Sequence, residues 1–109
     1  MLYTIYKIYK PNTDYLYIGC TNKFNVRKYR HKRACYNRVK KAYHRLLYKT
    51  IRDNEGFDTF IIEPIESFET NDKFVAFQKE QDYILLLKPN LNMISPPKKN
   101  LLNVVSDNV

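Results

Sequence analysis

The chain opens with two runs of apolar and aromatic residues on either side of a turn signal. Residues 2–10 (LYTIYKIYK) and 15–20 (YLYIGC) are rich in the β-branched and aromatic side chains that favour strands. Residues 11–14 (PNTD) separate them, and proline, asparagine and aspartate are typical of turns. The pattern predicts a β-hairpin with a four-residue loop.

That loop length fixes which residues face each other. Lys10 should pair with Tyr15, Ile8 with Tyr17 and Tyr6 with Gly19. Because side chains alternate along a strand, Tyr6 and Tyr17 should share one face as diagonal neighbours. Gly19 has no side chain, so we expect room there for another group to approach the phenol of Tyr6.

Two helices with a basic surface should follow. Residues 21–36 begin with Thr21 or Asn22 as a plausible N-cap. Residues 38–53 should form a second helix, with Lys and Arg on one side and an apolar stripe on the other. That stripe consists of Val39, Ala42, Leu46, Leu47 and Ile51.

The rest of the pattern predicts one more strand and one more helix. Residues 57–68 (FDTFIIEPIESF) read as a strand, in which Pro64 indicates a bulge or an edge position. Residues 69–88 read as a helix that stops before Pro89. The order β-β-α-α-β-α indicates an α/β fold of the α+β kind, a small three-stranded antiparallel or mixed sheet flanked by helices. We expect one domain over residues 1–95 and a C-terminal tail over residues 96–109.

Positive charge is concentrated in the predicted helices. The 109 residues carry 19 Lys and Arg against 11 Asp and Glu, a net charge of +8. Residues 23–52 hold twelve of those basic residues, and no acidic residue lies between Asp14 and Asp53. A solvated helix usually mixes both signs, so this block favours nucleic acid over a surface that only keeps the protein soluble. The candidate DNA-binding residues are Arg30, Lys32, Arg33, Arg38, Lys40, Lys41 and Arg45.

Other classes of protein are disfavoured. Cys20 and Cys35 form no CxxC pair, and with His31 and His44 they match no usual zinc spacing. No signal peptide and no apolar run long enough to cross a bilayer is visible. We therefore expect a soluble intracellular protein, cytoplasmic or nuclear, with no membrane partner. The Lys-, Asn- and Tyr-rich composition suggests a viral or phage origin, and the oligomeric state stays open.

Glu80 interrupts the apolar stripe of the last helix, which runs through Phe77, Ile84 and Leu87. A carboxylate in such a position is costly unless it is paired, hydrogen-bonded or bound to a metal. A structural ion pair with one of the many basic residues explains it as well as a metal site does.

Several motifs together resemble the GIY-YIG nuclease family. The name-giving tripeptides correspond to TIY at residues 4–6 and YIG at residues 17–19, with Thr4 in place of the first glycine. The stretch EQDYILLLKPNLN resembles the end of the family's catalytic domain, so the likeness spans about residues 3–92. The corresponding site residues are Tyr6, Tyr17, Arg27, His31, Glu80 and Asn92.

The resemblance implies hydrolysis of DNA phosphodiester bonds with one divalent ion, Mg²⁺ or Mn²⁺, held by Glu80. A single carboxylate in the constellation agrees with one metal, since two-metal sites need several. Tyr6 would be the general base. A free phenol has a pKa near 10, and we expect Arg27, a protonated His31 and the metal to lower it.

The remaining roles also come from the resemblance. Arg27 would neutralise charge that grows on the phosphoryl oxygens, and His31 would hydrogen-bond the reacting phenol or water. Tyr17 would hold the phosphate or a water at the metal, and Asn92 would orient the site. Two rivals remain: a binding module of the same fold that has lost cleavage, and a basic adaptor for an acidic protein. The second leaves Glu80 unexplained.

Overall fold

A computed structural model describes residues 1–92 and confirms the predicted order of elements. The elements are β1 (Leu2–Tyr9), β2 (Leu16–Thr21), α1 (Phe24–Tyr36), the 3₁₀ turn η1 (Lys41–His44), α2 (Leu46–Asp53), the 3₁₀ turn η2 (Phe57–Thr59), β3 (Ile61–Glu69) and α3 (Lys73–Leu87). No helix within these residues is long and apolar enough to cross a membrane. The predicted tail, residues 96–109, lies outside the described residues.

The three strands form one antiparallel sheet in the order β2-β1-β3, so the predicted sheet is confirmed in its antiparallel form. Ile8 faces Tyr17 and Tyr6 faces Gly19, as predicted. The last strand pair of the hairpin is Tyr9 with Leu16. Lys10 and Tyr15, which were predicted to pair, lie in the loop instead.

Pro64 has both of its predicted features. β3 is an edge strand, and the register against β1 shifts where Ile5 faces Glu66 but Tyr6 faces Pro64. The shift places an extra β3 residue opposite β1, as in a β-bulge, beside a proline that has no N–H to give to the ladder.

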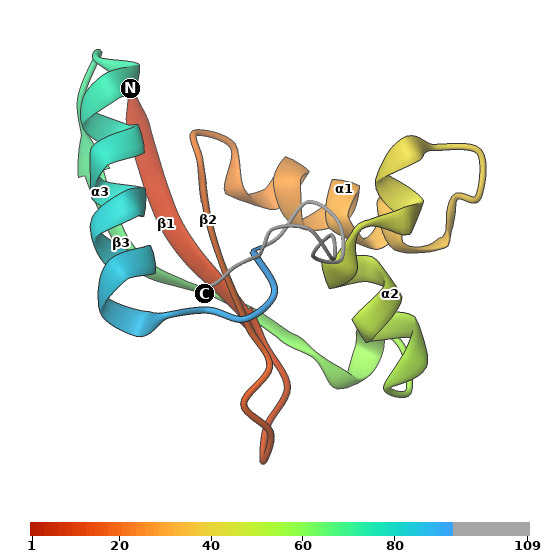
Figure 1. Cartoon of the computed structure of the whole chain (residues 1–109). Coiled ribbons are helices and arrows are strands. Elements are labelled where there is room, and N and C mark those ends of the chain that lie inside the picture. Colours follow the sequence, from red (N-terminus) through yellow and green to blue (C-terminus); the bar gives the residue numbers. More distant parts are fainter. Residues whose placement is uncertain (93–109) are drawn as a thin grey trace, which may run out of the picture.

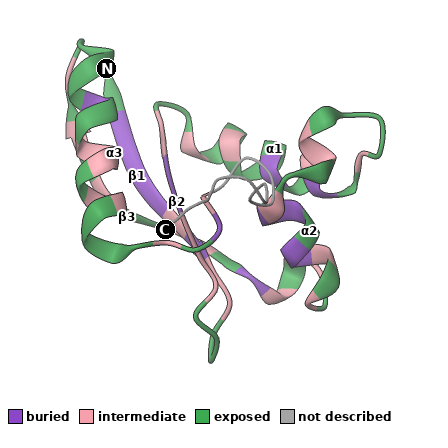
Figure 2. Cartoon of the chain, in the orientation of Figure 1, coloured by how far each residue is buried: buried purple, intermediate pink, exposed green. Residues whose placement is uncertain are grey.

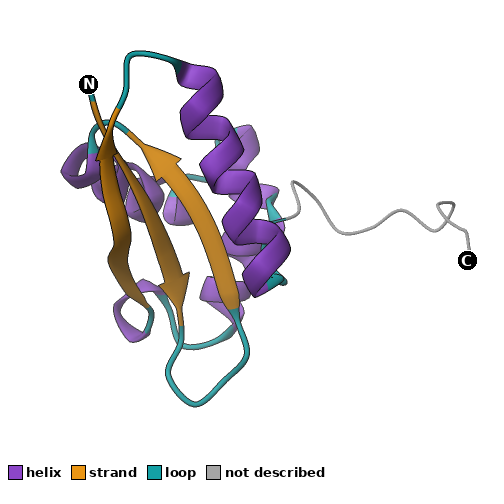
Figure 3. Cartoon of the chain, turned by 90° about the vertical axis from the view of Figure 1, so that its left-hand side faces the viewer, coloured by secondary structure: helices purple, strands orange, loops and turns teal. Residues whose placement is uncertain are grey.

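The sheet lies between two groups of helices (Figures 1 and 3). α1 and α2 cover the face of Tyr6 and Ile8, and the core there also contains Cys35, Leu47 and Ile51. α3 covers the opposite face and contacts mainly β2. Figure 2 shows that buried residues follow β1 and the inward sides of α1 and α2. The strands therefore carry functional side chains toward both helical layers.

The free edge of β2 is covered by the segment that follows α3. The amide of Leu16 donates to Oδ1 of Asn90, and the amide of Leu91 donates to the carbonyl of Leu16, both at 3.0 Å. The side chain of Asn92 accepts a hydrogen bond from the amide of Ile18, two residues further along β2, and donates one to its carbonyl. Residues 90–92 therefore act as a short side-chain-assisted strand that protects this edge.

The predicted helix over 38–53 is wrong in its first half. Residues 41–44 form only a 3₁₀ turn, Arg45 has an extended backbone, and α2 begins at Leu46. Val39 is 91% exposed, although the sequence pattern places it in the apolar stripe. The guanidinium of Arg52 explains the break, because it donates to the carbonyls of Cys35 and Tyr43 and so holds this connection in a bent path.

Other predicted boundaries move by a few residues. α1 begins at Phe24, with no side-chain cap, because β2 continues through Thr21. Residues 57–59 form η2, so the third strand starts only at Ile61. α3 begins at Lys73 because Asp72 is its N-cap and accepts the amide hydrogen of Phe74. The helix ends before Pro89, as predicted.

The apolar stripe predicted for α3 is also wrong in part. Phe77 is 54% exposed and Leu87 is exposed, whereas Ala76 is the residue of α3 that is buried. A three-stranded sheet is narrow, so it buries only one narrow row of side chains along α3. Glu80 still belongs to that row, one turn after Ala76, and is half-buried.

Candidate active site at the edge of the sheet

Tyr6 is fully buried and its ring lies directly over Gly19. A Cβ atom at position 19 would overlap Cζ and the hydroxyl of Tyr6. Gly19 therefore makes room for the phenol itself, and the expectation that it leaves space for another group is wrong. The predicted neighbour Tyr17 lies with its ring centre 6.4 Å from that of Tyr6.

His31 is buried and has a tyrosine hydroxyl on each ring nitrogen. Nε2 lies 2.7 Å from the hydroxyl of Tyr6, and Nδ1 lies 2.7 Å from the hydroxyl of Tyr48. Burial, with the charges of Arg27 and Arg45, lowers the pKa of His31 to about 4. The ring is therefore neutral at pH 7, and the expectation of a protonated His31 is wrong.

Tyr6 does not have the lowered pKa that we expected, and Tyr17 is similar to it in this respect. Burial and the neighbouring Tyr17 raise the pKa of the Tyr6 phenol, although the charge of Arg27 opposes the rise. Burial likewise raises the pKa of Tyr17, against the effect of Arg27. At neutral pH both phenols keep their protons in this state of the protein, so any base chemistry needs a partner that accepts a proton from the phenol.

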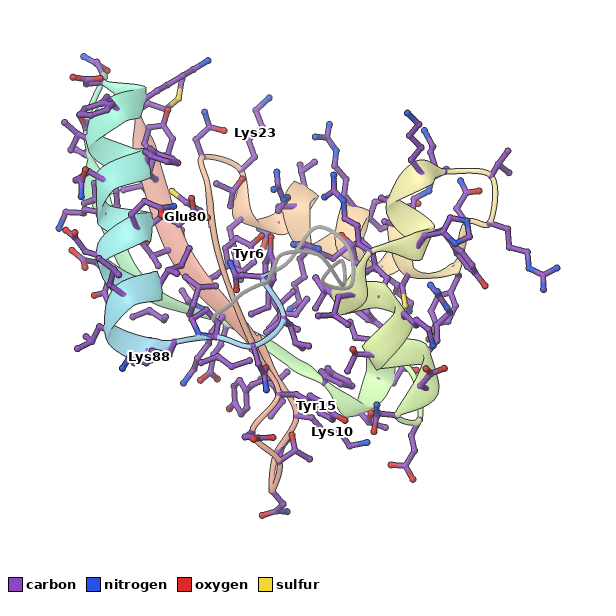
Figure 4. The ribbon with its side chains drawn as sticks, viewed as in Figure 1. Tyr6, Lys10, Tyr15, Lys23, Glu80 and Lys88 are labelled. Atoms are coloured by element: carbon purple, nitrogen blue, oxygen red, sulfur yellow. The ribbon has the colours of Figure 1, made fainter. Side chains whose placement is uncertain are left out.

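Glu80 enters a pocket of about 310 Å³ on the α3 side of β2, which we call the Glu80 pocket. Figure 4 shows Glu80 reaching from α3 toward the sheet, while Tyr6 lies between the sheet and α1. Burial raises the pKa of the Glu80 carboxyl, and the charge of Arg27 opposes this. The pocket is lined by Tyr3, Cys20, Thr21, Asn22, Arg27, Lys73, Ala76, Phe77 and Glu80.

A second pocket of about 230 Å³ lies over His31, and we call it the Tyr48 pocket. It is lined by Tyr17, Arg27, Arg30, His31, Ala34, Arg45 and Tyr48. Arg27 lines both pockets and so connects Glu80 with the residues around Tyr6. The sequence pattern did not identify Tyr48. Its only sequence signal is its place beside Leu47 on the inward side of an amphipathic helix, where a tyrosine usually belongs to the core.

Asn92 bonds the backbone at the middle residue of the YIG tripeptide. Its Oδ1 accepts the amide hydrogen of Ile18 and its Nδ2 donates to the Ile18 carbonyl, both at 2.8 Å. Ile18 stands between Tyr17 and Gly19 on β2. Asn92 therefore supports the strand that carries the site, and it does not line either pocket.

The candidate DNA-binding residues separate into two groups. A third pocket, of about 300 Å³, shares Arg30 and Ala34 with the Tyr48 pocket. The pockets along α1 bring together Arg30, Arg33, Lys40 and Arg45. Lys32, Arg38 and Lys41 line none of these pockets, and the ammonium of Lys32 lies 4.0 Å from the carboxylate of Asp58.

The donors around Glu80 fit one Mg²⁺ or Mn²⁺ ion better than a closed metal cage. Within residues 1–92 there is no cluster of three or more His, Cys, Asp or Glu side chains able to hold a metal. Mg²⁺ is commonly bound by one or two carboxylates while water and substrate phosphate supply the other ligands. A half-buried carboxylate at an open pocket suits that mode of binding.

Comparison with known proteins identifies the family and the fold. Residues 2–92 match the GIY-YIG catalytic domain. The structure is similar to that of the catalytic domain of the homing endonuclease I-TevI, with a TM-score of 0.67 and 17% identity over 88% of this chain and 99% of that one. It is equally similar to a mutant of the I-TevI catalytic domain, over 98% of this chain and 100% of that one, again with a TM-score of 0.67 and 17% identity. No curated protein sequence matches. Since the family match spans most of the chain, this protein belongs to the GIY-YIG family.

Proposed function

We propose that this protein is a DNA endonuclease that hydrolyses phosphodiester bonds with one divalent metal ion. The observation that carries the proposal is the position of Arg27. Arg27 lines both the Glu80 pocket and the pocket around His31, so one basic residue lies beside both a carboxylate and a tyrosine–histidine pair. A scissile phosphate beside Arg27 would lie within reach of both.

Glu80 would hold the ion as its single protein carboxylate. Bound there, Mg²⁺ or Mn²⁺ would draw charge from the scissile phosphate. Burial disfavours the ionised form of Glu80, and both Arg27 and a bound cation favour it. A cation bound beside Glu80 would therefore favour the ionised carboxylate, and in a partly dry pocket their interaction is stronger than in water.

Tyr6 would take the proton of the attacking water. Because its own pKa is raised, the phenol acts by passing a proton on: the water proton moves to Oη of Tyr6 as the Tyr6 proton moves to Nε2 of His31. The bond from the water oxygen to phosphorus forms, and the bond to the leaving oxygen breaks. The leaving oxygen keeps the electron pair and takes a proton from solvent, and His31, whose lowered pKa favours the neutral ring, then releases its extra proton to solvent. Since Tyr6 is fully buried, one of the side chains that cover it must move when DNA binds.

Arg27 and Tyr17 would act on the phosphate. The guanidinium offers several N–H donors to phosphoryl oxygens and compensates the charge that grows on them. Tyr17 keeps its proton at neutral pH and lies close enough to Arg27 and Glu80 for both charges to act on its pKa, so its hydroxyl can donate a hydrogen bond to the scissile phosphate. Asn92 would contribute through β2, because it holds the backbone of Ile18.

Single-turnover cleavage of supercoiled, linear, branched and flapped DNA, with and without Mg²⁺ or Mn²⁺, tests the proposal. Glu80→Gln removes the charge but keeps the shape, so metal-supported cleavage should collapse. Asp82→Asn is the matched control, because Asp82 is an exposed carboxylate on the same helix. Tyr6→Phe should lower the rate by about 10² or more, the scale of losing a general base.

The same experiment distinguishes the proposal from the alternative of an inactive binding module. That alternative requires that the wild-type chain bind DNA and cut none of these substrates with either ion. A Tyr6→Phe variant that cleaves at the wild-type rate would show that the phenol is structural and that Tyr6 handles no proton in the reaction.

A further inference from the structure

We propose that the Tyr48 pocket binds a second phosphate of the cleaved DNA strand, beside the scissile one, and that Tyr48 transmits its binding to Tyr6 through His31. This inference rests on the proposed function. It assigns a ligand to a pocket that Glu80 does not reach, and it makes Tyr48 a positioning residue for the tyrosine that handles the proton.

The lining of the Tyr48 pocket is suited to an anion. Arg27, Arg30 and Arg45 line it, and no carboxylate is among the lining residues within 1–92. Within residues 1–92 these three arginines form no ion pair with an acidic side chain. Several unpaired guanidinium groups around one hollow repel each other until an anion enters, and a phosphodiester is the anion that this fold is proposed to meet.

The Tyr48 pocket is separate from the place of the scissile phosphate. The scissile phosphate has to contact the ion on Glu80, and Glu80 lines the other pocket. Among the residues that the structure describes, the two pockets share only Arg27. A phosphate in the Tyr48 pocket is therefore a neighbour of the scissile phosphate along the strand, and it binds without a metal.

The hydrogen bonds of His31 connect this pocket with Tyr6. A neutral imidazole has one N–H donor and one acceptor nitrogen. Since each nitrogen lies 2.7 Å from a tyrosine hydroxyl, one tyrosine must donate to the ring and the other must accept from it. The direction of the bond at Tyr48 therefore sets the direction of the bond at Tyr6.

A phosphate in the pocket selects one of the two directions. Phosphate oxygens only accept hydrogen bonds, so the Tyr48 hydroxyl would turn its proton toward the phosphate and accept from Nδ1–H of His31. Nε2 is then the acceptor and receives the hydroxyl proton of Tyr6. The remaining lone pairs of Tyr6 are left for the attacking water. Binding of the neighbouring phosphate thus prepares Tyr6 for its role.

Cleavage of DNA that carries one neutral methylphosphonate tests the phosphate site. The substitution is moved stepwise along the strand on both sides of the scissile position. One flanking position should slow single-turnover cleavage by about 10-fold in the wild type, the scale of losing a charge-assisted contact. The same substitution should cost Tyr48→Phe much less, because the variant has already lost the coupling. Equal sensitivity at every flanking position, or an undiminished effect in Tyr48→Phe, would overturn the proposal.

A second readout does not depend on cleavage. The chain has two histidines, so the exposed His44 can be replaced by Gln, which leaves His31 as the only imidazole for ¹⁵N NMR. A short DNA duplex with EDTA present should shift His31 toward the Nδ1–H tautomer. Tyr48→Phe should bind the duplex without that shift.

Tyr36→Phe is the matched control for the tautomer measurement. The Tyr36 hydroxyl accepts the amide hydrogen of Phe57 at 2.9 Å, so this variant also loses a tyrosine hydrogen bond but none at the site. It should show the wild-type shift. An unchanged tautomer in wild-type protein saturated with DNA, or the same shift in Tyr48→Phe, would refute the coupling. A chain that shows the shift but cuts no DNA would refute the proposed cleavage and leave the phosphate site standing.

Discussion

Tyr6 occupies the space that a side chain at Gly19 would fill. Tyr6 on β1 is paired with Gly19 on β2. A Cβ atom at position 19 would lie closer to the Tyr6 phenol than Cβ atoms in real proteins lie to any non-bonded neighbouring atom. Gly19 of the YIG tripeptide therefore leaves the space that the ring of Tyr6, the tyrosine of the first tripeptide, occupies. The two halves of the family motif are one structural unit, since a larger residue at position 19 would displace Tyr6.

Gly19→Ala should therefore displace Tyr6. The ring is fully buried, so relief of the overlap requires shifts in the core, which we expect to cost about 1–3 kcal/mol of unfolding free energy. The hydroxyl should also leave His31, and cleavage should drop at temperatures where the variant is still folded. Urea unfolding and single-turnover cleavage measure the two effects.

A double-mutant cycle identifies the cause. Tyr6→Leu removes the ring atoms that the new methyl group would overlap. In that background Gly19→Ala should cost much less stability than in the wild type. If the cost is the same in both backgrounds, the glycine is required for another reason.

Asn92→Ala should weaken β2 at Ile18. The substitution removes an acceptor from the Ile18 amide and a donor from its carbonyl, and leaving such groups unsatisfied costs about 1–3 kcal/mol. Hydrogen exchange of the Ile18 amide should accelerate, and cleavage should fall because Tyr17 and Gly19 flank this residue. Asn90→Ala removes a single bond, to the Leu16 amide, and should affect cleavage less. Equal exchange rates at Ile18 in wild type and Asn92→Ala would contradict this role.

His31 should make the protein less stable in mild acid. Its pKa falls from an ordinary 6.5 to about 4 in the folded chain, so the unfolded chain binds the proton first as the pH falls. Its contribution is complete above pH 6.5 and is lost between about 6.5 and 4, by about 3 kcal/mol in total. His31→Gln should flatten the pH profile of unfolding free energy in that window. A profile that His31→Gln does not alter would show that the ring is not held neutral.

The hairpin was predictable because its information is local. Two strand-forming runs and a short loop determine the pairing of Tyr6 with Gly19 without reference to the rest of the chain. Glu80 was also found from the sequence, because a carboxylate one turn from apolar residues is unusual on a buried row. Arg27 and His31 came from the resemblance to the family, because a spacing of four on a helix so rich in Lys and Arg does not single them out.

The features that could not be predicted depend on contacts between distant segments. The bend before α2 follows from Arg52, which reaches two carbonyls in other turns. Tyr48 joins the site only because α2 packs against α1, which brings its hydroxyl to His31. The neutral state of His31 also could not be read from its neighbours in sequence, since burial is the main cause of its lowered pKa.

DNA affinity should depend on arginines along α1 more than on total charge. Each phosphate contact adds about −0.9 to the slope of log affinity against log salt on duplex DNA. Arg30→Gln and Arg33→Gln should each make that slope shallower, because both residues line the pockets that continue from Arg27. Lys32→Gln removes the same charge from the same helix, but Lys32 lies near Asp58 and lines none of these pockets, so its slope should stay close to that of the wild type. Fluorescence anisotropy over a series of salt concentrations, with EDTA to prevent cleavage, gives the three slopes.

Identical slopes for the three variants would mean that DNA responds to the charge of the whole surface. A wild-type affinity for DNA that is independent of salt would exclude the DNA-binding surface altogether.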